Sequence, residues 1–67
     1  MNTNVVFINT FTKERIAIYQ YRDVVPPIPS TGDFIRVGDD HDYVYIVERR
    51  EFDYDSTNAV VITIQVA

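Results

Sequence analysis

The chain has 67 residues, of which 46% are hydrophobic, contains no cysteine and carries a formal charge of −4. A chain of this length forms one small domain, here residues 1–67, and the hydrophobic content excludes intrinsic disorder. The absence of cysteine excludes disulfides, zinc fingers and iron-sulfur clusters. The net acidity argues against a general nucleic-acid binder, which needs clustered positive charge.

The first half of the chain predicts a hairpin followed by a stiff connection. Residues 5–11 (VVFINTF) and 15–22 (RIAIYQYR) are rich in β-branched and aromatic side chains and are separated by a short polar break. Residues 24–32 (VVPPIPSTG) contain three prolines, which lack backbone donors and favour extended conformations. We therefore expect this segment to be a loop rather than a central strand.

The second half predicts three more strands. Residues 33–37 (DFIRV) alternate like a half-buried strand, and residues 42–54 (DYVYIVERREFDY) form a long strand whose apolar phase slips near Glu48 and Arg49, which indicates a bulge. Residues 59–66 (AVVITIQV) place Val60, Ile62, Ile64 and Val66 on one face. This uncharged last strand should be paired inside a barrel or across a subunit boundary, because an exposed edge of this kind invites aggregation.

No window shows the helical spacing of apolar residues, and turn signals recur at short intervals. The sequence predicts an all-β fold in which about five antiparallel strands close into a small barrel with no substantial helix.

A spaced residue pattern spans residues 29–66: Pro29, Gly32, Asp33, Ile35 and Val37, then Tyr45, Val47, Arg50 and Phe52, and a final alternating strand. This pattern resembles small barrel proteins of bacteria and phages that are similar to the Src-homology-3-like barrel. The resemblance implies that fold and an origin in a mobile element; it implies no catalytic residue.

Candidate chemical groups cluster in the turn that contains Asp39, Asp40, His41 and Asp42. Three carboxylates and an imidazole could bind a cation, but their spacing does not fit a calcium loop, and Asp is frequent in tight turns. We interpret the cluster as turn residues and predict no metal and no cofactor. His41 with Ser30 or Ser56 matches no nucleophile motif, so we expect no enzyme.

Several strands carry apolar side chains on both faces, whereas a barrel has only one inner face. Covering the outer face would be favourable, so the sequence predicts a homo-oligomer, most simply a dimer. The expected interface residues are Phe7, Tyr19, Tyr21, Tyr43, Tyr45 and Phe52.

The preferred function is a non-enzymatic interaction protein of bacterial or phage origin, located in the cytoplasm, that binds another protein. One alternative is an oligomer that binds a small, nucleotide-like molecule at the subunit boundary through Arg36, Arg49, Arg50 and Tyr54. The second alternative is an acidic mimic of nucleic acid. No apolar segment approaches the roughly 18 residues needed to span a bilayer, so no membrane partner is expected.

Overall fold

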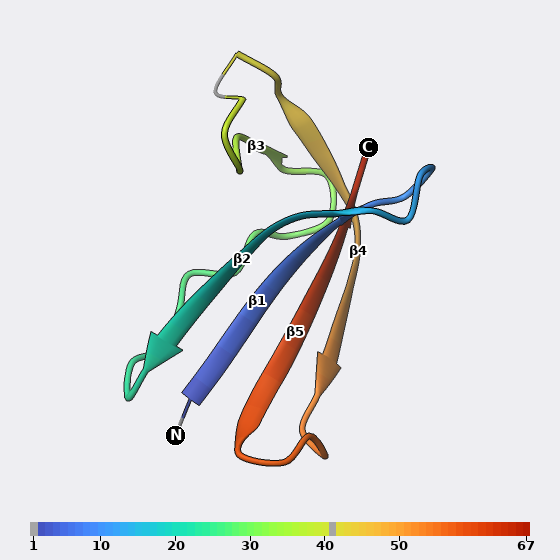
Figure 1. Cartoon of the computed structure of the whole chain (residues 1–67). Helices are drawn as coiled ribbons and strands as arrows, with labels where there is room; N and C mark the ends of the chain where they lie inside the picture. Colours follow the sequence, from blue (N-terminus) through green and yellow to red (C-terminus); the bar gives the residue numbers. More distant parts are fainter. Residues whose placement is uncertain (1, 41) are drawn as a thin grey trace.

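The computed structural model describes residues 2–40 and 42–67, and these residues form one curled sheet that resembles half of a barrel (Figure 1). The strands are β1 (Asn2–Asn9), β2 (Arg15–Arg22), β3 (Phe34–Ile35), β4 (Tyr45–Asp53) and β5 (Ala59–Val66). They are arranged in the order β2-β1-β5-β4-β3, with no helix among the described residues. The all-β prediction is therefore confirmed.

The sheet is mixed rather than purely antiparallel, and this part of the prediction is wrong. β1 and β5 pair in parallel from Asn2 opposite Ala59 to Asn9 opposite Val66. The other three pairs are antiparallel. Side-chain alternation is the same in both kinds of pair, so the sequence pattern does not reveal the direction of a partner strand.

β5 is the central strand, since it pairs with β1 on one side and with β4 on the other. Its alternation is the one predicted: the side chains buried in the core are Val60, Ile62, Ile64 and Val66. β5 has no charged side chain, and both of its backbone edges are hydrogen-bonded to neighbouring strands of the same protomer. Pairing continues past its end, because Ile46 and Ala67 exchange backbone hydrogen bonds of 2.9 and 3.0 Å.

The core lies on one face of the sheet, which we call the concave face. Val5 and Phe7 of β1 stand beside Ile62 and Ile64 of β5, and all four side chains are buried. The opposite, convex face is only partly apolar, with Val6, Ile8 and Val61 half-buried among polar residues. The excess of apolar side chains on two faces is thus smaller in the structure than in the sequence pattern.

The predicted bulge in β4 is confirmed. Val47 lies opposite Val66, but Arg49 lies opposite Gln65, so Glu48 is the extra residue on the β4 side. Val47 is 1% exposed and belongs to the core. The bulge restores the inward phase after Val47, so that Phe52 stands opposite the buried Ile62.

β3 is shorter than predicted, because only Phe34 and Ile35 pair with β4. The expected alternation still holds: Val37 is buried and Phe34 is exposed. Before β3, Gly32 has a φ of +94°, and the Ser30 N–H donates to Asp33 Oδ2 at 2.7 Å. Asp33 is the one residue of the predicted strand that takes part in this turn, and Arg36 and Val37 lie beyond the end of β3.

The sheet does not close into a full barrel, because β2 has no strand partner other than β1 among the described residues. The gap beside β2 is bridged by side chains instead. The Gly38 N–H donates to the Tyr19 hydroxyl at 3.3 Å, and the Tyr19 ring meets the Phe7 ring edge-on at 5.9 Å. These contacts hold Val37 over the core in place of a further pair of hydrogen-bonded strands.

Candidate functional site

An apolar groove of about 600 Å³ lies on the concave face at the end of the sheet where β2 and β4 finish. Its described lining residues are Thr3, Asp23, Val24, Val25, Pro26, Ile28, Phe52, Tyr54, Val60 and Ile62. Apolar and aromatic side chains dominate this set, and Asp23 is the charged member. Such a composition is typical of binding grooves.

The floor of the groove is buried and its rim is exposed. Val60 and Ile62 of β5 form the buried floor. On the rim, by contrast, Val25 is 96% exposed and Tyr54 is 72% exposed. Exposed apolar side chains that are gathered at one hollow, rather than scattered singly, mark an interaction site.

One wall of the groove is the segment that follows β2. Asp23 adopts a positive φ of 59°, which turns the chain away from β2. Pro26 is buried, whereas Val24 and Val25 before it remain exposed. Because proline fixes its own φ and restricts the residue before it, the wall is stiff although it contains no strand.

The other wall is the end of β4 and the turn after it. Phe52 and Tyr54 have ring centroids 6.5 Å apart, and the Arg50 guanidinium lies 5.7 Å from the centre of the Phe52 ring. Asp53 fixes the turn: its Oδ1 accepts from the Asp55 N–H at 2.9 Å, and its Oδ2 accepts from the Ser56 hydroxyl at 3.2 Å. This turn holds Tyr54 at the rim.

A second hollow of about 450 Å³ is polar. It is lined by Asn2, Asn4, Gln20, Tyr21, Arg22, Thr57, Asn58 and Ala59. These residues carry hydrogen-bonding groups but little apolar surface, so the apolar groove is the stronger candidate for a site that binds by burial.

The predicted interface residues do not form one surface. Phe7 is in the core, and Phe52 lies in the groove. Tyr19 and Tyr21 pair with Val5 and Thr3 of β1 and therefore share the concave face. The rings of the remaining pair, Tyr43 and Tyr45, are tilted against each other at 57° with centroids 4.4 Å apart, just before and at the start of β4.

The predicted ligand-binding residues are also dispersed. Only Tyr54 lines the groove. Arg49 and Arg50 lie opposite Gln65 and the buried Ile64 and so belong to different faces of β4. Arg36 follows β3 and is exposed. One protomer does not bring these three guanidinium groups together around Tyr54.

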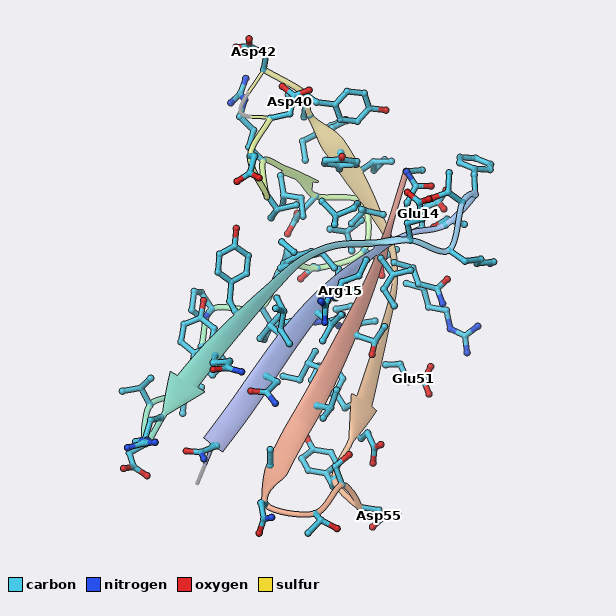
Figure 2. The ribbon with its side chains drawn as sticks, viewed as in Figure 1. Glu14, Arg15, Asp40, Asp42, Glu51 and Asp55 are labelled. Atoms are coloured by element: carbon cyan, nitrogen blue, oxygen red, sulfur yellow. The ribbon has the colours of Figure 1, made fainter. Side chains whose placement is uncertain are left out.

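The acidic turn shows the bonding expected of a turn: the Asp42 N–H donates to Asp40 Oδ1 at 3.1 Å. Figure 2 shows both residues at the tip of the β3–β4 connection, far from Glu51 and Asp55. His41, part of the same cluster, lies outside the described residues. Within residues 2–40 and 42–67, no group of three or more His, Cys, Asp or Glu side chains is arranged to hold a metal ion.

The wall residues Val24 and Val25 are functional candidates that the sequence reasoning missed. It interpreted residues 24–32 as a stiff connection and assigned them no binding role. The available signal was the pair of valines placed directly before the prolines, in a segment too stiff to turn both side chains inward.

Comparison of the chain with protein-family models, with curated proteins and with solved structures finds no match in any of the three. No helix in the described part of the chain has the length and apolar character required to cross a bilayer. The functional conclusion therefore depends on the groove itself.

Proposed function

We propose that the protein is a non-enzymatic interaction module whose apolar groove binds a short extended segment of a partner protein. The observation that carries this proposal is the exposed rim of Val24, Val25 and Tyr54 around a buried β5 floor. Burial of apolar side chains in such a groove supplies affinity, and a preformed stiff wall lowers the entropy lost on binding.

The partner segment is apolar with a basic residue. Asp53 and Asp55 stand on either side of Tyr54 at the rim, and the whole chain has a charge of −4. These carboxylates favour a positively charged side chain beside the apolar ones and disfavour an acidic one.

The nucleotide-binding alternative has less support, because Arg36, Arg49 and Arg50 are not gathered at Tyr54 in one protomer. The nucleic-acid mimic also has less support. Its acidic residues would have to form one extended surface, whereas those at Asp40 and Asp55 lie at opposite ends of the molecule (Figure 2).

We extend the proposal to a cytoplasmic accessory factor of bacterial or phage origin, related to the Src-homology-3-like barrels. Its support is the residue pattern from Pro29 to Phe52 that resembles such proteins, together with the small curled five-stranded sheet. The parallel β1–β5 pair is a departure from the antiparallel barrel that this resemblance predicts.

The test is selection from a displayed library of random short peptides, followed by titration of a selected peptide into labelled protein by NMR. We expect enrichment of apolar and basic residues and shifts at Val25, Phe52 and Tyr54. Val25→Asp should abolish binding, whereas Val44→Asp, the same change on the exposed β3–β4 hairpin, should not. Selected peptides that shift other residues, or bind Val25→Asp equally well, would refute the proposal.

A further inference from the structure

We infer that two copies of the chain associate through the outer edge of β2, in antiparallel orientation, to form one continuous sheet. This inference does not depend on the groove, because neither Ile18 nor Tyr19, at the middle of β2, belongs to the groove lining. The interface named here is a backbone edge, not the broad outer faces that the sequence suggested.

The unpaired edge of β2 is long. β2 spans eight residues, Arg15–Arg22, and pairs only with β1. In the described part of the chain no backbone hydrogen bond links its other side to another segment. Gly38 approaches Ile16 near the start of the strand, which leaves Ala17 to Arg22 as the available edge.

From Ala17 to Tyr21 this edge lacks the usual protection against pairing, because the bulge in β2 lies before it, at Ile16. Exposed edges are normally guarded by lysine, proline, bulges or inward-pointing charges. Residues 16–21 of β2 have no charged side chain, and Ile18 and Tyr19 are 40% and 39% exposed. The neighbouring proline-rich segment cannot cover the edge with hydrogen bonds at positions that lack an N–H.

Two-fold symmetry permits such a pair. A two-fold axis perpendicular to the sheet keeps residues of the same face opposite each other, so one residue faces its own copy across the axis. If Tyr19 faces its own copy, Ala17 lies opposite Tyr21 of the partner subunit, and Ile18 lies opposite Gln20 of the partner subunit. The pair of Ala17 with Tyr21 brings apolar and aromatic surface together, and Ile18 lies against the uncharged Gln20, so no charge opposes either contact.

Charges at the strand ends do not oppose this arrangement. In this register Arg22 lies opposite Ile16 of the partner subunit, and neither Arg15 nor Arg22 lies opposite a like charge. Like charges directly opposite would destabilise the pair, and this register avoids them.

The edge of β4 lacks these properties. Beyond Val47 no backbone hydrogen bond among the described residues reaches its side away from β5, so Glu48–Asp53 is also unpaired there. The two central registers of self-pairing would place Arg50 against Arg50 of the partner subunit, or Glu51 against Glu51 of the partner subunit. Like charges directly opposite are destabilising, so β4 does not compete with β2.

Light scattering after size exclusion, over a range of concentrations, tests the inference. We expect a mass twice that of the 7.8 kDa chain at high concentration. Ile18→Lys should halve this mass, and Glu51→Lys, a charge change on the other edge, should leave it unchanged. If Ile18→Lys does not fold, as judged by circular dichroism, Gln20→Lys at an exposed position of the same edge replaces it.

Cross-linking adds a direct readout, because the chain has no cysteine of its own. With a short bis-maleimide reagent, Ile18→Cys should yield covalent dimers and Glu51→Cys should not. A mass that stays at 7.8 kDa at every concentration, a dimer that survives both lysine changes in β2, or preferential cross-linking through Glu51→Cys would each overturn the inference. Because Ile18 lies outside the groove, peptide binding should be retained in Ile18→Lys whichever result is obtained.

Discussion

The two unpaired edges of the sheet, on β2 and on β4, differ in the charge of their side chains. β2 reads RIAIYQYR, with charges only at its ends, while the unpaired part of β4 reads ERREFD, with charges on both faces. Figure 2 shows Glu51 pointing away from the sheet on the β4 side. An open edge thus invites pairing only where its side chains permit a second strand to approach.

The largest expected effect is the loss of stability when an aromatic side chain near one of the two edges is removed. Phe7 is buried under β2 against Tyr19, so Phe7→Ala should reduce the free energy of unfolding by about 3–5 kcal/mol. Phe52 on β4 is 40% exposed, so Phe52→Ala should cost clearly less while weakening peptide binding. Chemical denaturation of both variants measures the difference, and equal losses would contradict the assignment of Phe7 to the core.

A smaller effect is expected at the contact that closes the gap beside β2. Gly38 has a φ of +79°, and a Cβ there would lie 3.2 Å from Ile16 Cγ2 and 3.5 Å from the Ile16 carbonyl oxygen. Gly38→Ala should therefore cost more than the roughly 1–2 kcal/mol of the left-handed backbone alone. Gly32→Ala is the control, since it has a φ of +94° but no neighbour within 4 Å. Equal stability of the two variants would show that the contact with Ile16 is unimportant.

At the end of β4, Asp53→Ala should remove both hydrogen bonds that shape the following turn. These bonds are exposed, so the expected loss of stability is about 1 kcal/mol. Peptide affinity should fall as well, because Tyr54 is no longer held at the rim. Asp53→Asn keeps an oxygen acceptor for the Asp55 N–H and should retain most of the affinity; a full loss in that variant would point to a direct charge effect instead.

The smallest change in stability is expected for Glu51→Val, which lies on an exposed position and should stay within about 0.5 kcal/mol of the wild type. Its effect on association should be larger, because the change removes a guarding charge from the β4 edge. Light scattering should then show species above the dimer. A mass distribution identical to that of the wild type would mean that Glu51 does not protect the edge.

Much of the strand pattern could be predicted because it depends on local alternation. The buried face of β5 and the bulge at Glu48 follow directly from apolar phase. The parallel pairing of β1 with β5 could not be predicted, because alternation is identical for either strand direction. The prediction of a closed barrel is wrong for a related reason. The prolines and the turn at Gly32 reduce the number of residues that can form a strand before β4, so β3 has only two paired residues.

The candidate site was harder to predict than the fold. Phe52 and Tyr54 were singled out from the sequence, but as members of two different sets of residues. Their wall partners Val24 and Val25 are brought opposite them only by the path of a loop, which no periodic pattern encodes. Conversely, the sequence predicts one ligand-binding set that includes Arg36, Arg49 and Arg50, but the two faces of β4 and the end of β3 separate these residues.

Amide hydrogen exchange, measured residue by residue at a low and a high protein concentration, tests the difference between the two edges most directly. Pairing of β2 with a second copy should slow exchange of its outward-facing amides as the concentration rises, while exchange in Glu48–Asp53 of β4 stays the same. Exchange in β2 that does not depend on concentration, or new protection confined to β4, would contradict the account.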